Sequence, residues 1–206
     1  MHVVHCRTGS LENEWGLAEI DVVKGESKVL HELNSKISNR IFAAYSDEQY
    51  IYVGGLFNFF RIDTQNNTVE SLIDLLPSNI VQCIKSTNLY ALAVCTDDGS
   101  VTMFQTDTTE TEFIAPGQFD QVTDVVSIKD ELWMGRGKGL VRRRETGILS
   151  YLPDVNVLQL HQSQYYSNWL YAGSQNSGVY RLDIQSTNPD IQYLDLGILG
   201  NKVHDF

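Results

Sequence analysis

The chain has 206 residues, of which 42% are hydrophobic and 20% charged, and its formal net charge is −11 at pH 7. This length permits one large all-β domain or two small ones, and the hydrophobic content excludes a disordered chain. The acidic balance argues against a surface that grips phosphate backbones, so a nucleic-acid partner is not expected. No apolar run approaches the roughly 20 residues of a membrane helix, so no membrane association is expected either.

The N-terminal region predicts three strands, in residues 2–6, 16–22 and 28–33. Throughout the chain, short alternating apolar runs are separated by Gly, Asn, Asp and Ser, which is typical of strands and turns. The first residues lack the basic start and long apolar core of a signal peptide. The chain also has three cysteines in apolar runs without metal-site spacing, Cys6, Cys83 and Cys95. They predict buried free thiols, and hence a cytoplasmic or nuclear protein; the alternative is a fragment whose targeting sequence is missing.

Four segments further along the chain share one pattern. Each has an aliphatic residue followed by an aromatic, and three of them place a glycine two positions after the aromatic. The aromatic anchors are 38, 43 and 38 residues apart, at Tyr52, Tyr90, Trp133 and Tyr171. An apolar strand precedes each anchor, and two more strands follow it across turns rich in Gly and Asn. Each unit is therefore four strands in about 40 residues, the size of a propeller blade.

The two ends of the chain complement each other in this pattern. Residues 201–206 match only the first strand of a unit, whereas the N-terminal residues match the other three. We therefore predict an all-β, single-domain, five-bladed β-propeller of four-stranded antiparallel blades, with one blade shared between the termini so that no sheet edge stays open. The alternative is a fragment of a larger propeller. The predicted blades are 201–206 with 1–35, then 36–77, 78–117, 118–154 and 155–200.

The units resemble the "LWxGTxxGLxRYD" repeat of bacterial periplasmic sensor propellers. The resemblance is carried by Leu132-Trp133-Met134-Gly135 with Gly139-Leu140-Val141-Arg142, and by Leu170-Tyr171-Ala172-Gly173 with Gly178-Val179-Tyr180-Arg181-Leu182-Asp183. The period is also similar to that of WD-repeat proteins, although the Trp-Asp dipeptide is missing. Both resemblances imply the propeller fold and no particular activity.

A basic run is the sharpest local feature of the sequence. Five of the 15 basic residues fall within nine positions around one hairpin turn: Arg136, Lys138, Arg142, Arg143 and Arg144. In a strand, Arg142 and Arg144 point to one side and Arg143 to the other. Such a cluster could contact an acidic or phosphorylated protein partner, since arginine forks onto those groups. The alternatives are a solvated hairpin, or pairing with the chain's own acidic residues.

First strands lie nearest the axis of a propeller, so their polar residues are expected to line a central channel: Gln82, Asp124, Gln159 and Asp205. No metal-ligand spacing, phosphate-binding loop or catalytic triad pattern is present, so we expect no cofactor, no metal and no catalysis. These features favour a non-catalytic protein-interaction scaffold that uses a propeller face or rim. A small-ligand or carbohydrate-binding propeller is the alternative, and a glycoside hydrolase using two channel carboxylates a more distant one.

Overall fold

The computed structural model consists of antiparallel β-sheets over the residues that it describes. These are residues 2–7, 15–21, 24, 26–29, 40–47, 49–66, 68–88, 91–105, 111–114, 120–144, 147–175 and 178–195. The chain divides into two compact units, Met1–Ile84 and Lys85–Phe206. No helix in the described ranges is long and apolar enough to cross a membrane.

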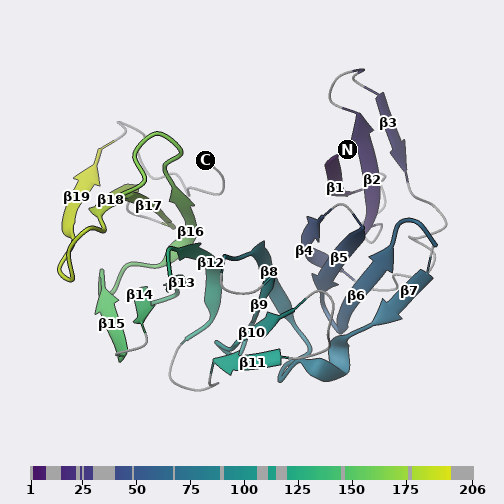
Figure 1. Cartoon of the computed structure of the whole chain (residues 1–206), viewed down its shortest axis with the longest axis horizontal. Helices are drawn as coiled ribbons and strands as arrows, with labels where there is room; N and C mark the ends of the chain where they lie inside the picture. Colours follow the sequence, from purple (N-terminus) through teal and green to yellow (C-terminus); the bar gives the residue numbers. More distant parts are fainter. Residues whose placement is uncertain are drawn as a thin grey trace. The chain divides into compact units, whose positions relative to one another are not determined.

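The first unit contains a three-stranded sheet and a four-stranded sheet (Figure 1). Both sheets are antiparallel, with the strands in chain order. The three-stranded sheet is β1 (His2–Arg7), β2 (Trp15–Asp21) and β3 (Glu26–Val29). The four-stranded sheet is β4 (Ile41–Ser46), β5 (Tyr50–Gly55), β6 (Asn58–Asp63) and β7 (Thr68–Ser71), followed by the 3-10 turn η1 (Ile73–Leu75).

Three further four-stranded sheets follow, again with the strands in chain order. The first is β8 (Val81–Ser86), β9 (Leu92–Thr96), β10 (Val101–Phe104) and β11 (Thr111–Ile114). The second is β12 (Val122–Ile128), β13 (Glu131–Arg136), β14 (Gly139–Arg144) and β15 (Gly147–Tyr151). The third is β16 (Val157–Gln162), β17 (Trp169–Ser174), β18 (Val179–Asp183) and β19 (Asp190–Leu194).

The predicted repeat of four-stranded units is confirmed for four sheets. Their second strands are mostly buried on both faces, as expected of strands covered by neighbouring sheets, whereas the described fourth strands β7, β15 and β19 are mostly exposed. The fifth sheet has the three N-terminal strands that the sequence predicted. Its expected fourth strand, residues 201–206, lies outside the described residues, so the structure shows four complete sheets and not five. A closed ring and a single domain stay predictions.

Strand register corrects one of the four aromatic anchors. Tyr52, Trp133 and Tyr171 each face an arginine of the third strand, namely Arg61, Arg142 and Arg181 respectively. In the β8–β11 sheet the corresponding pair is Ala93 and Met103. The matching turns support this alignment, because the N–H of Thr96 donates to Ser100 as the N–H of Ser174 donates to Gly178. The prediction of Tyr90 as an anchor was therefore wrong, and the spacings become 41, 40 and 38.

The glycine that follows two of these anchors makes room for the next sheet. A Cβ on Gly54 would lie 2.4 Å from Cγ1 of Val81, and one on Gly135 would lie 2.9 Å from Cγ1 of Val157. Val81 and Val157 are fully buried. The second strand of one sheet and the first strand of the next therefore approach too closely for a side chain at the glycine. This contact explains the recurring glycine that the sequence showed.

The core of the second unit joins two neighbouring sheets. Trp133 and Leu140 of the β12–β15 sheet pack in one cluster with Leu160, Leu170 and Leu182 of the β16–β19 sheet, and all but Leu160 are at most 2% exposed. This shared core fixes the position of one sheet against the other, since dense packing leaves little freedom. Any site lined by these two sheets is therefore held in a defined geometry.

Candidate functional site

Strands β13 and β14 form the hairpin that carries the predicted basic run. Its alternation is confirmed: Arg142 and Arg144 both contact Glu131, whereas Arg143 lies on the opposite side. There Arg143 contacts Glu112 of β11 at 3.0 Å. The charges of β14 are thus paired within the chain, which is one of the alternatives that the sequence left open.

The tip of the hairpin lies apart from these pairs. The guanidinium of Arg136 donates to the main-chain carbonyl of Lys138 at 2.8 Å. The Lys138 ammonium lies 3.9 Å from Asp120, and its side chain is 73% exposed. The five predicted residues therefore do not form one cluster. A partner contact at the tip stays a prediction, with Lys138 as its most accessible cation.

Arg142 is engaged by other residues of the second unit. Its side chain is 4% exposed, its Nε donates to Glu131 Oε2 at 2.7 Å, and its NH1 donates to the carbonyl of Ser186 at 2.8 Å. The guanidinium also lies over the ring of Trp133, 4.8 Å from its centre. Such burial argues against Arg142 as a direct partner contact and gives it a role in holding the two sheets together.

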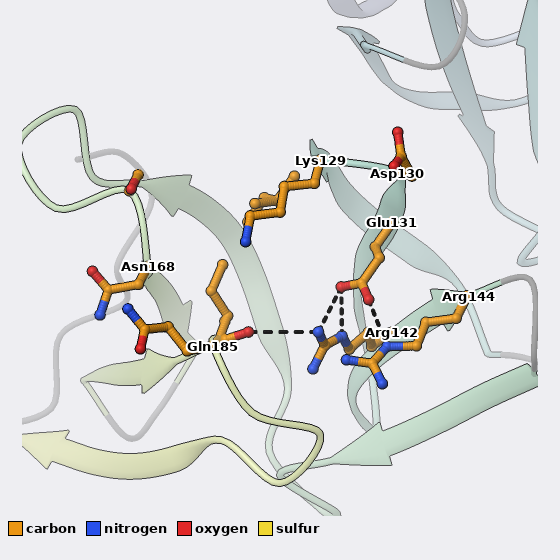
Figure 2. A pocket seen from close by; sticks show the side chains of 10 residues that line it. Lys129, Asp130, Glu131, Arg142, Arg144, Asn168 and Gln185 are labelled. Carbon is orange, nitrogen blue, oxygen red and sulfur yellow. Dashed lines mark hydrogen bonds and ion pairs between the residues drawn. The ribbon is translucent and has the colours of Figure 1, made fainter.

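A pocket of about 330 Å³ opens beside Arg142 (Figure 2). We call it the Lys129 pocket. It is bounded by the β12–β13 turn, by β14, by the β16–β17 loop and by the segment after β18. Its lining residues are Ile128, Lys129, Asp130, Glu131, Arg142, Arg144, Ser167, Asn168, Ile184 and Gln185.

The floor of the Lys129 pocket is an ion-pair network centred on Glu131. One carboxylate oxygen meets Arg142, and the other lies 2.5 Å from Nε of Arg144. NH1 of Arg144 donates to the hydroxyl of Thr187 at 3.2 Å. Two guanidinium groups thus share one carboxylate and leave one positive charge in excess. Paired and hydrogen-bonded, these groups form a fixed floor.

Lys129 supplies a further positive charge above this floor. It stands in the β12–β13 turn with a φ of 56°, a left-handed conformation that non-glycine residues rarely adopt. Figure 2 shows its side chain extending into the pocket, opposite Asn168 and Gln185, while Asp130 points away. Among the described residues, Lys129 makes no ion pair. It is therefore the cation of the pocket that is available to a ligand.

The opposite wall is held by Asp183 at the end of β18. Its carboxylate accepts hydrogen bonds from the side-chain amide of Asn168 at 3.2 Å and from the main-chain N–H of Gln185 at 3.2 Å. The β16–β17 loop is also fixed from within, because the hydroxyl of Ser163 accepts the N–H groups of Tyr165 and Tyr166. The wall is therefore positioned in advance, with the amide of Gln185 exposed beside it.

Asp124 of β12 links three successive sheets of the second unit. Its side chain is only 2% exposed, and Oδ1 lies 3.2 Å from the ammonium of Lys85 on β8. Oδ2 accepts the main-chain N–H of Leu160 on β16 at 2.9 Å. Burial raises the pKa of the carboxyl above its ordinary value of 3.8, while Lys85 and the backbone donors act in the opposite direction. These contacts give Asp124 a structural role.

The raised pKa of Asp124 predicts a pH effect. The folded chain binds this proton more tightly than the unfolded chain, so the residue's contribution to stability falls as the pH rises from 3.8 through the raised pKa. Asp124→Asn cannot titrate, yet it keeps an oxygen for the N–H of Leu160. We expect the stability of the wild type relative to this variant to decrease over that interval in urea unfolding. A difference that grows with pH would contradict the prediction.

The other predicted channel residues lie in different positions. Gln159 faces Gly173 as Asp124 faces Gly135, so these two occupy equivalent places. Gln82 follows Val81 as Thr123 follows Val122, one residue before that place, which in β8 belongs to Cys83. Asp205 lies outside the described residues. Channel lining by these residues stays a prediction.

The sequence reasoning missed Lys129 and Glu131. Neither belongs to a recognisable motif, and both lie next to the Trp133 anchor in an ordinary polar turn. One signal was available: Arg142 and Arg144 share a side of β14, and an acidic residue on the neighbouring strand could reach both. Only the register of β13 against β14 identifies that residue as Glu131.

The β16–β19 sheet has a second notable surface, rich in aromatic residues. Tyr166 stacks on Trp169, with ring centres 4.2 Å apart, and Arg181 lies 4.2 Å from the centre of the Trp169 ring. Trp169 and Tyr171 are only half-buried, whereas the equivalent anchor Trp133 is fully buried. The difference arises because the β16–β19 sheet covers Trp133.

Comparison with known proteins defines the class of fold. No family model matches the sequence, and no curated protein matches it either. Solved structures, by contrast, do match this chain. The extracellular domain of BT3049, described as a hybrid two-component system of B. thetaiotaomicron, superposes with a TM-score of 0.67 at 15% identity, covering 87% of this chain and 26% of that one. The fold is therefore propeller-like.

Two further structures support the same class. A chain of the mitotic checkpoint complex gives a TM-score of 0.67 at 10% identity, covering 86% of this chain and 58% of that one. PorZ, a surface component of the type-IX secretion system of Porphyromonas gingivalis, gives 0.61 at 14% identity, with 82% and 29% covered. This chain thus spans between 26% and 58% of the length of these three structures. The likeness shows an all-β repeat fold that is shared by sensor domains and assembly proteins.

The predicted cytoplasmic or nuclear location is wrong. Three of the similar structures are extracellular domains, and PorZ is a bacterial surface component. The premise of free thiols also fails, because Cys83 and Cys95 are both disulfide-bonded. Disulfides persist in oxidising compartments and are rare in the cytosol. Sequence reasoning erred by treating apolar surroundings as evidence for unpaired cysteines.

Proposed function

We propose that this chain is a non-catalytic binding module that holds a protein partner at the Lys129 pocket, on the extracellular side or at the cell surface. The observation that carries the proposal is the availability of Lys129 above a floor whose other charges are already paired. A fixed floor with one available cation suits recognition, because little side-chain freedom is lost when a ligand binds. The aromatic side chains of the adjoining loop offer the kind of surface that protein interfaces favour.

The contacts of Asp124 support a non-catalytic role. A general acid or base must reach its substrate, yet both Asp124 oxygens are engaged within the chain and the side chain is buried. A small-ligand binding protein is the second candidate, favoured by the 330 Å³ volume of the pocket. The two candidates differ in whether the bound species is a segment of another protein.

Affinity capture with matched variants tests the proposal. We expect the Lys129→Glu variant to recover about tenfold less of a specific captured protein, or less still. The substitution replaces the available positive charge of the pocket with a negative one. Lys138→Glu makes the same charge change at the hairpin tip and should retain that protein. The purified partner must then bind the wild-type chain directly. Equal recovery of the partner by the wild type and both variants would overturn the proposal. Loss of the partner only with Lys138→Glu would place the contact at the hairpin tip.

We also propose that the five sheets belong to one closed propeller, in which residues 201–206 complete the β1–β3 sheet. Support comes from that sheet, in which the described residues form three of the four strands of the repeat. Deleting residues 201–206 should then lower the free energy of unfolding by about 2 kcal/mol or more, since Val203 and Phe206 would lose buried surface. Unchanged stability in urea would contradict closure through this segment.

A further inference from the structure

We propose that the Lys129 pocket binds a carboxylate side chain in an acidic peptide segment of the partner. This inference rests on the proposed function and names the chemistry of the group that is recognised. The lining has three cations and two carboxylates, and Asp130 points away from the cavity. The pocket interior therefore carries a positive excess within a chain of net charge −11. An anionic group is the ligand that this excess favours.

Hydrogen-bond donors are available to such an anion. Arg142 is buried and held by Glu131 and main-chain carbonyls, so it shapes the floor of the pocket. Lys129 extends an ammonium group with three donors into the space. The side-chain amide of Gln185 lines the same space from the opposite wall. A carboxylate between these two residues would receive a charge-assisted hydrogen bond from one and a neutral one from the other.

The charge of the floor favours a carboxylate over a phosphate. Glu131 remains inside the pocket, held between two arginines at 2.7 Å and 2.5 Å. A phosphate carries up to two negative charges near neutral pH and would be repelled by this fixed carboxylate. The excess charge of the network lies on arginines already engaged by Glu131, so Lys129 is the one cation available to the ligand, and a single negative charge matches it. Of the two partners that the sequence predicted, an acidic protein is therefore favoured over a phosphorylated one.

A peptide is favoured as the source because aromatic side chains stand next to the pocket. Tyr165 is 91% exposed and Tyr166 54% exposed, in the same loop as the lining residues Ser167 and Asn168. Tyrosine is one of the residue types that contribute most of the binding energy at protein interfaces. A residue adjacent to the bound carboxylate could therefore pack on this loop.

The backbone of Lys129 provides independent support. Its left-handed conformation would be adopted with less strain by glycine or asparagine, the residues that such turns prefer. A lysine at this position is disfavoured locally. The conformation nevertheless directs the side chain into the pocket, as Figure 2 shows. Backbone strain of this kind is frequently found at functional sites.

A titration followed by NMR of ¹⁵N-labelled protein tests the assignment with defined probes. The probes are N-acetyl-Glu-Phe-amide, its Gln-Phe analogue, acetate and inorganic phosphate. We expect the Glu-Phe probe to shift the Gln185 side-chain amide signals, and the Gln-Phe analogue to bind about fivefold or more weakly because it lacks the charge. Phosphate binding as tightly as the Glu-Phe probe would overturn the carboxylate assignment. Acetate binding as tightly would overturn the peptide assignment in favour of a small free carboxylate.

Matched variants locate the site. Lys129→Gln should weaken binding of the Glu-Phe probe about fivefold or more, whereas Lys138→Gln should leave it unchanged. An equal loss in both variants would overturn the pocket as the binding site. Should Lys129→Glu abolish partner capture while no probe binds the wild type, the proposed function stands and the carboxylate assignment fails. Should the probe bind while capture is unaffected, the carboxylate site stands and the proposed function fails.

Discussion

Trp133→Ala is expected to lower the free energy of unfolding by about 3–5 kcal/mol, the range for deleting a large buried aromatic side chain. The ring is fully buried, stacks on Tyr151 at 5.7 Å and lies under the guanidinium of Arg142 at 4.8 Å. It also packs against Leu170 of the next sheet. Removal therefore opens a cavity between two sheets that cannot easily collapse. Urea unfolding followed by circular dichroism measures the loss.

Tyr165→Ala is the matched control for this prediction. The Tyr165 side chain is also a large aromatic in the second unit, but it is 91% exposed. Its removal should change stability by no more than about 0.5 kcal/mol. A Trp133→Ala effect as small as that of Tyr165→Ala would mean that the two sheets do not share the described core.

Glu131→Gln is expected to cost about 3 kcal/mol, at the lower end of the range for breaking a buried ion pair by removing one partner. The carboxylate holds Arg142, whose side chain is 4% exposed, and Arg144, whose side chain is 23% exposed. Neutralising Glu131 leaves two cations facing each other with no anion between them. The amide oxygen can still accept one hydrogen bond, but it cannot balance a charge. Urea unfolding of both proteins at one pH gives the difference.

Glu112→Gln provides the control for the ion-pair prediction. Glu112 pairs with Arg143 of the same strand β14 at 3.0 Å, but both side chains are more than a third exposed. Exposed pairs contribute about 0–1 kcal/mol. Equal effects of the two substitutions would show that the Glu131 network is not the fixed floor described above. The Lys129 pocket would then lack the pre-positioned floor on which the proposed recognition depends.

The repeat could be predicted from the sequence because each strand is short and bounded by turn residues. The anchors Tyr52, Trp133 and Tyr171 were found correctly, since each precedes a glycine, and the next sheet requires that glycine at Gly54 and Gly135. Tyr90 was wrongly predicted as an anchor because the anchor position of the β8–β11 sheet holds Ala93. Because alanine gives no aromatic signal in the sequence, the nearby tyrosine was assigned to the anchor position instead.

The Lys129 pocket could not be predicted, because it depends on contacts between two sheets. The basic run suggested one exposed cluster, but alternation along β14 sends Arg143 toward Glu112 and Arg142 toward Glu131. The spacing of residues along the sequence does not show which acidic residue faces which arginine in the fold. The sequence also could not identify the disulfide bonding of Cys83 and Cys95, since the same apolar surroundings suit a buried thiol.

Hydrogen exchange of the chain with and without its captured partner tests the central claim most directly. Binding at the Lys129 pocket is expected to slow exchange in the β12–β13 turn around Lys129, in the β16–β17 loop from Ser163 to Asn168, and in the segment at Gln185. These three segments are far apart in sequence but border one pocket (Figure 2). Slower exchange confined to the hairpin tip around Lys138, with these three segments unchanged, would contradict it.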